Sequence, residues 1–243
     1  PIQLVAHLAS CSVACVDDGR VRLHEAMRES CDVYFYQVGK QLGIERIARY
    51  SRQIGLGTPT GIEIGGEKAG LVPDEAWSRR VRGTPWYLGE TISVAIGQGP
   101  LLVTPLQIAT MMATVANGGW HVTPHIVSGE TERRPSGLDT EHLAIVRDAL
   151  SAVVNEGGTG APARVEGLEV AGKTATVQVI EQATWIGSED LPYERRDHAW
   201  FASFAPVDDP QLVVVAFVEH GGHGSRAAAP VAKLVYETFF DAL

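Results

Sequence analysis

Residues 169 to 180 read EVAGKTATVQVI, and this stretch marks the change of the chain from helical to strand patterns. Apolar residues fill most of it, yet Lys173, Thr174 and Thr176 lie in the middle. Because side chains alternate along a strand, we expect the two threonines to share one face and Lys173 to point the other way. Two interpretations follow: the lysine reaches water from an edge strand, or it lines an opening in the protein.

The neighbouring patterns place this stretch in an α+β fold. Helical spacing predicts helices over these ranges: Val21 to Ser30, Val33 to Leu42, Ile44 to Ile54, Thr104 to Asn117, Glu141 to Asn155 and Ala228 to Leu243. Strands are predicted over these ranges: Leu168 to Gly172, Thr174 to Ile180, His198 to Ala205 and Leu212 to Val218. Residues 58–99 are rich in Gly and Pro and indicate irregular structure over a core. The order of elements predicts an antiparallel sheet flanked by helices.

Composition limits the function classes. The chain has 243 residues, of which 45% are hydrophobic, enough for one large domain. Its net charge of -9 and pI near 5.4 argue against nucleic acid as a partner. The longest apolar run, Leu212 to Val218, is too short to span a bilayer, and the first residues lack the pattern of an export signal. The abrupt apolar opening at Ile2 to Ala9 predicts that sequence is missing upstream.

Ser30, Cys31 and Asp32 form a second feature, between two helical patterns. On its own this tripeptide fits a helix cap, because Ser and Asp are both favoured N-cap residues. Its combination with the Lys173-Thr174 strand is more informative, since a loop can present a hydroxyl and a carboxyl to the same site.

Two long blocks make the pattern specific. They are ESCDVYFYQVGKQLGIERIARYSRQIGLGTPTGIEI, residues 29–64, and GETISVAIGQGPLLVTPLQIATMMATVANGG, residues 89–119. With Ser30, Asp32 and the Lys173-Thr174 pair, they resemble the transpeptidase domain of class B penicillin-binding proteins, closest to the penicillin-binding protein 2 group of cell elongation. That family has three active-site motifs: S-x-x-K, S-x-N or S-x-D, and K-T-G or K-S-G. The resemblance implies one transpeptidase domain over residues 1–243, in the fold shared with serine β-lactamases.

Two departures from the family pattern stand out. No S-x-x-K occurs in the chain, and Pro1 resembles the residue that follows this motif, so we expect the domain to be N-terminally incomplete, with its nucleophilic serine and lysine before residue 1. The segment from Ser10 to Arg20 also looks shorter than in relatives, which predicts a gap there. Ala175 replaces the glycine of the third motif; its methyl group is tolerated in extended backbone and strained at positive φ.

The resemblance implies a role for each remaining site residue. Ser30 relays a proton toward the leaving amine, and Asp32 fixes the loop and the local charge. Lys173 contacts Ser30 and attracts the substrate carboxylate, which Thr174 and Thr176 hydrogen-bond directly. The N–H of Thr176 and that of the missing serine form the oxyanion hole.

A metal is a separate question. Some relatives have a zinc-ligating cysteine at the position of Cys31, and Asp18 lies where the companion histidine is expected. We favour a buried, inert thiol over zinc, and we expect no cofactor.

The function implied is that of a peptidoglycan D,D-transpeptidase that cross-links stem peptides by serine acyl transfer during elongation. The implied partners are the stem peptide, β-lactam antibiotics and other membrane proteins of the elongation machinery. The intact protein would be anchored in the inner membrane with this domain in the periplasm. One alternative is a catalytically degenerate relative that binds a peptide or a partner; another is a β-lactam hydrolase or sensor, for which no deacylating base is evident.

Overall fold

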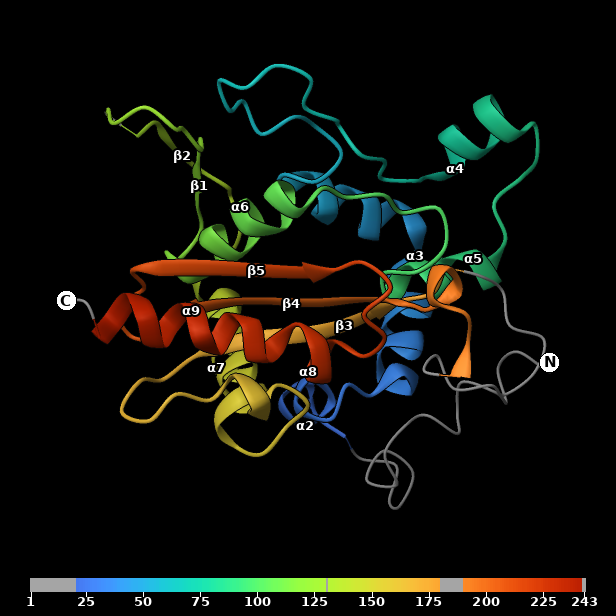
Figure 1. The fold of residues 1–243 in the computed structure, drawn as a ribbon. Helices are drawn as coiled ribbons and strands as arrows, with labels where there is room; N and C mark the ends of the chain where they lie inside the picture. Colours follow the sequence, from blue (N-terminus) through green and yellow to red (C-terminus); the bar gives the residue numbers. More distant parts are fainter. Residues whose placement is uncertain (1–20, 130, 180–189, 242–243) are drawn as a thin grey trace. The chain divides into compact units, whose positions relative to one another are not determined.

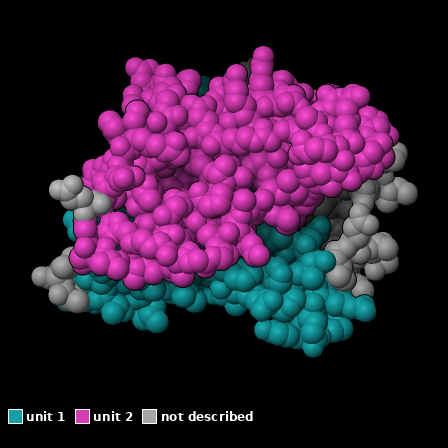
Figure 2. Space-filling view, turned by 90° about the horizontal axis from the view of Figure 1, so that it is seen from above, with its two compact units in different colours: residues 1–32, 144–243 teal, residues 33–143 magenta. Residues whose placement is uncertain are grey.

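The computed structural model describes residues 21–129, 131–179 and 190–241. The chain divides into two compact units, coloured separately in Figure 2. One contains residues 1–32 and 144–243, and the other contains residues 33–143. The predictions made for residues before 21 lie outside the described residues. They are the gap between Ser10 and Arg20 and the metal ligand at Asp18.

The first unit is built on an antiparallel sheet, as predicted. Strands β3 (Ala171–Val177), β4 (His198–Ala205) and β5 (Leu212–Val218) lie in the order β3-β4-β5. In the described residues β3 is therefore an edge strand. Its register places Lys173 opposite Ala202 and Thr174 opposite Phe201, which puts the two side chains on opposite faces of the sheet.

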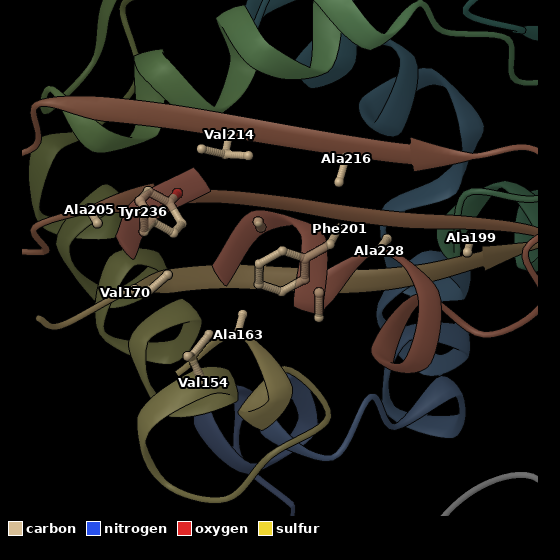
Figure 3. Close-up of a cluster of buried hydrophobic side chains, with 12 residues drawn as sticks. Val154, Ala163, Val170, Ala199, Phe201, Ala205, Val214, Ala216, Ala228 and Tyr236 are labelled. Carbon is tan, nitrogen blue, oxygen red and sulfur yellow. The ribbon is translucent and has the colours of Figure 1, made fainter. Parts of the chain in front are cut away.

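Two C-terminal helices pack against this sheet. They are α8 (Gly224–Ala227) and α9 (Ala229–Asp241), and Figure 1 shows α9 running along the strands. Between helices and sheet lies the core, in which Phe201 and Tyr236 are the largest buried side chains (Figure 3). The Tyr236 hydroxyl donates to Ser203 Oγ at 2.8 Å, so the one polar group of the tyrosine is satisfied inside the core.

The remaining elements of this unit are short helices and one long helix that lie outside the sheet. Helix α2 (Leu23–Arg28) comes first, and α7 (Thr140–Asn155) leads into the 3₁₀ helix η3 (Ala161–Ala163). A second 3₁₀ helix, η5 (Tyr193–Arg195), precedes β4. The Asn155 side chain donates to the carbonyl of Val170 at 2.9 Å, which ties the end of α7 to the start of the third strand.

The second unit is mainly helical. Its elements are α3 (Asp32–Gln53, whose first residue belongs to the first unit), α4 (Glu75–Trp77), the π-helix η2 (Ser78–Arg82), α5 (Leu88–Ala95), α6 (Pro105–Ala116), β1 (Trp120–Val122) and β2 (Arg133–Pro135). The two short strands form an antiparallel pair. Helix α6 has a full capping box, in which Thr104 Oγ1 accepts from the Gln107 N–H at 3.1 Å and Gln107 Oε1 accepts from the Thr104 N–H at 2.9 Å.

Several predicted boundaries were wrong. The two strands expected at Leu168 to Gly172 and Thr174 to Ile180 are the single strand β3, which continues through Gly172. The break expected at Gly43 is confirmed, by contrast: α3 consists of two helical segments that meet at a kink, where Gly43 has the non-helical angles φ 73° and ψ 160°. Residues 58–99 were expected to be irregular, but they contain helix α5. The prediction missed this helix because it has only eight residues and lies between Gly- and Pro-rich segments.

No helix in the described part of the chain is long and apolar enough to cross a membrane.

Candidate active site

Ser30 ends helix α2 in a left-handed conformation. Its N–H donates to the carbonyl of Met27 at 3.2 Å, and the N–H of Cys31 donates to that of Ala26 at 2.8 Å. These two bonds form a Schellman motif, whose left-handed position usually holds glycine. Ser30 occupies it at φ 55°. The interpretation of Ser30 as an N-cap is therefore wrong: it closes the preceding helix, which leaves its side chain free to bond elsewhere.

We predict that Ser30→Gly unfolds at a higher urea concentration than Ser30→Ala. Both variants lack the hydroxyl, so they differ mainly in the backbone. Alanine keeps the left-handed strain, whereas glycine relieves it, and the expected difference in the free energy of unfolding is about 1 kcal/mol. Equal unfolding midpoints for the two variants would show that this conformation carries no strain.

Lys173 meets Ser30 directly. Its Nζ donates to Ser30 Oγ at 2.9 Å and to the Thr174 carbonyl at 3.0 Å. These partners are 143 positions apart in sequence, and the predicted contact between them is confirmed. The side chain is half-buried, so the interpretation of Lys173 as a lysine that simply reaches water is wrong.

The charge of Lys173 is tuned by its surroundings. Burial lowers the pKa of its ammonium from 10.5 to about 8, and the negative charge of Asp32 acts in the opposite direction. Asp32 is the first residue of α3, two positions after Ser30. The predicted influence of this carboxylate on the local charge is thus present in the structure, but burial dominates. A lysine that titrates near pH 8 is typical of a functional site.

The three residues after Lys173 continue along β3. Thr174 Oγ1 donates to Thr159 Oγ1 at 2.9 Å, a partner that the sequence analysis did not identify. Ala175 is exposed and pairs with Trp200 in the sheet, and its φ is not positive. The strained alternative for this alanine is therefore wrong. Thr176 is half-buried opposite Ala199, on the same face as Thr174.

Cys31 is almost fully buried, with 1% of its surface exposed. It is disulfide-bonded. Burial was predicted, but the expected free thiol was wrong. A disulfide sulfur offers no thiolate to zinc. Among the residues that the structure describes, no group of three or more His, Cys, Asp and Glu side chains could hold a metal ion; Asp18 is not among these residues.

The sequence of the chain matches the penicillin binding protein transpeptidase domain over residues 13–237. The chain belongs to this family. Among curated proteins, this transpeptidase domain is 37% identical over 234 residues to the peptidoglycan D,D-transpeptidase MrdA of Acinetobacter baumannii, covering 90% of the chain and 34% of the relative. It is 36% identical to MrdA of Haemophilus influenzae, covering 92% of the chain and 37% of the relative. The chain thus spans about a third of the length of these relatives.

Solved structures of the penicillin-binding protein 2 group confirm the predicted fold. The domain is similar to penicillin-binding protein 2 of Helicobacter pylori in its complex with MreC, with a TM-score of 0.82 and 32% identity over 92% of this chain and 41% of that one. It is also similar to penicillin-binding protein 2 of Pseudomonas aeruginosa in complex with WCK 5153, with a TM-score of 0.78 and 34% identity over 90% of this chain and 49% of that one. The resemblance to this group is confirmed.

Proposed function

We propose that the intact protein containing this domain is a peptidoglycan D,D-transpeptidase that cross-links stem peptides during cell-wall elongation. The observation that carries the proposal is the 2.9 Å hydrogen bond from Lys173 Nζ to Ser30 Oγ. It joins the second and third motifs of the family in one site, where an ammonium with a lowered pKa lies beside a hydroxyl. A serine and a lysine of the first motif would be supplied by sequence outside this chain.

The proposed reaction is an acyl transfer in two steps. A serine oxygen attacks the D-alanyl-D-alanine carbonyl, the C–N bond breaks, and the terminal D-alanine leaves with a proton on its amine. An amine of a second stem peptide then takes the acyl group and releases the serine. In this proposal Ser30 passes the proton to the leaving amine. The hydrogen bond that Lys173 donates to the Ser30 oxygen supports this role, because it leaves the hydroxyl proton of Ser30 available for transfer.

Lys173 and the threonines have a separate task in this proposal. The stem peptide ends in a carboxylate, and the Lys173 ammonium provides the attracting charge. Thr174 and Thr176 offer hydroxyl donors on the strand that runs beside the ammonium. We further propose β-lactam antibiotics as ligands of this site, since they are acylating agents that carry a carboxylate.

The position of the protein in the cell is part of the proposal. We propose a periplasmic domain, anchored to the inner membrane in the intact protein, that works with membrane proteins of the elongation machinery. The similarity to penicillin-binding protein 2 of H. pylori, which was solved in complex with MreC, supports this assignment.

Labelled penicillin and intact-protein mass spectrometry test the function. A form extended to include the first motif is expected to gain one penicillin mass per molecule, and the present 243 residues are expected to gain none. Stoichiometric labelling of the present chain would mean that the nucleophile has been assigned to the wrong place. No labelling of the extended form would favour a degenerate protein that binds a peptide or a partner, and rapid release of the label would favour a β-lactam hydrolase.

The rate of acylation should depend on the protonation of Lys173. Because the pKa of this ammonium is lowered to about 8, its charge is present below pH 8 and is lost as the pH rises above it. The second-order rate constant for penicillin acylation is therefore expected to fall about tenfold per pH unit above 8. Lys173→Arg is the control, since an arginine stays charged to above pH 12 and should remove this decline. A decline at the same pH in the arginine variant would assign it to another group.

A further inference from the structure

The loop Gly157-Gly158-Thr159-Gly160 lies between the two segments of the site. It follows α7 and precedes η3. The N–H of Thr159 donates to the carbonyl of Arg28 at 3.2 Å, in the last turn of the helix that Ser30 closes. The Thr159 hydroxyl accepts from Thr174 Oγ1 at 2.9 Å. One residue therefore contacts both the Ser30 segment and the Lys173-Thr174 strand.

The glycines on either side of Thr159 allow this close approach. A Cβ atom on Gly158 would lie 2.7 Å from the carbonyl oxygens of Arg28 and Val153. A Cβ atom on Gly160 would lie 3.0 Å from Val153 Cγ1 and 3.3 Å from the ring of Phe201. Because backbone oxygens fill the space beside Gly158 and side chains fill that beside Gly160, the loop is packed against its neighbours on both sides of Thr159.

The hydroxyl of Thr174 has a single proton, so it can donate to only one acceptor at a time. In the structure Thr174 Oγ1 lies 2.9 Å from Thr159 Oγ1, a distance at which either hydroxyl can donate its proton to the other. A carboxylate is a stronger acceptor than a hydroxyl, and hydroxyl protons rotate to suit their partners. When a carboxylate binds, Thr159 can become the donor to Thr174, and Thr174 can then give its proton to the ligand. Thr174 Oγ1 is also 3.5 Å from Lys173 Nζ, so an anion bound here would lie within the field of the ammonium.

We propose that Thr159 is a positioning residue for the substrate carboxylate, which holds the Thr174 side chain in one rotamer and completes its hydrogen bonding when that carboxylate is bound. This inference rests on the proposed transpeptidase function. Thr159 contacts the ligand only through Thr174. The inference concerns recognition of the carboxylate, and it leaves the chemical step to the other residues of the site.

Esterified penicillin provides a test that distinguishes this role from a merely structural one. In the extended protein, Thr159→Val is expected to slow acylation by a penicillin about tenfold, because it weakens a hydrogen bond to a charged group. Acylation by the methyl ester of the same penicillin, which lacks the carboxylate, should not change. The acid-to-ester ratio of rates therefore falls tenfold. Thr159→Ser, which keeps the hydroxyl, should retain a ratio within threefold of the parent.

Thr238→Val is the matched control. Thr238 is exposed on α9, where its hydroxyl donates to the carbonyl of Leu234 at 2.8 Å, and its replacement should leave the ratio unchanged. Equal losses with acid and ester in Thr159→Val would overturn the inference, because they would indicate a structural role. If the parent protein is not acylated at all, the proposed function fails, and a measurement of the Thr174 rotamer then decides the inference alone.

That measurement uses the three-bond couplings of the Thr174 methyl group in the labelled protein. A single rotamer is expected in the parent and an average over rotamers in Thr159→Val, with Thr159→Ser resembling the parent. An unchanged single rotamer in Thr159→Val would overturn the inference whether or not the protein is an enzyme.

Discussion

Replacing Lys173 by alanine in the extended protein is expected to reduce the rate of penicillin acylation by 100- to 1,000-fold. The change removes the ammonium that donates to Ser30 Oγ at 2.9 Å, and with it the charge that we propose attracts the substrate carboxylate. Loss of one pre-positioned donor to a developing charge typically costs about 3 to 4 kcal/mol of transition-state stabilisation. Labelled penicillin at several concentrations gives the second-order rate constant directly.

Lys233→Ala is the control for this measurement. Lys233 lies on α9, where it pairs with Glu237 at 3.6 Å on the surface, and such pairs contribute little. Its removal should leave the acylation rate unchanged. A Lys173→Ala protein that is acylated within threefold of the parent rate would contradict the assignment of Lys173 to the active site, provided that both proteins unfold at the same temperature.

Replacing Gly224 by alanine is expected to lower the free energy of unfolding by about 3 kcal/mol. Gly224 begins α8, and a Cβ atom there would lie 2.4 Å from the carbonyl oxygen of Trp200 and 2.5 Å from that of Ala175. Both neighbours are backbone atoms of paired strands, which cannot move aside like a flexible side chain, so α8 has to shift away from the sheet. Urea titration followed by tryptophan fluorescence measures the effect.

Gly89→Ala is the matched change at an open position. Gly89 is exposed in α5, its φ is not positive, and no atom would lie within 4 Å of an added Cβ. Alanine is the better helix former, so this variant should match the parent or gain up to about 1 kcal/mol. If Gly224→Ala behaves like Gly89→Ala, the close packing of α8 on β3 and β4 is not a constraint on this protein.

The sequence predicted the bounds of two strands correctly and those of the third wrongly. The bounds of β4 and β5 were predicted correctly, because both are apolar runs that end at turn residues. The limits of β3 were wrong because Gly172 was taken as an end. In the fold this glycine lies inside the strand, where a Cβ atom would be 2.7 Å from Phe201 and Ser203. Only the neighbouring strand reveals that the position needs a residue without a side chain.

Some residues of the site were predicted from the sequence, and one was not. The resemblance to the family predicted that Ser30, Asp32 and Lys173 belong together, since the residue types and their order were characteristic. It could not predict Thr159, because the sequence of a Gly-rich loop says where the chain turns but not which strand its hydroxyl will face. The available signal was a threonine between glycines.

The sequence by itself determined the kinds of element, the family and the chemical groups available, because these follow from local periodicity and from residue type. The tertiary structure alone decided their environment. It placed Ser30 in a left-handed turn, lowered the pKa of Lys173 to about 8 through burial, and brought Thr159 to within 2.9 Å of Thr174. Burial and contact between distant segments depend on how the whole chain packs, and no local pattern of residues contains that information.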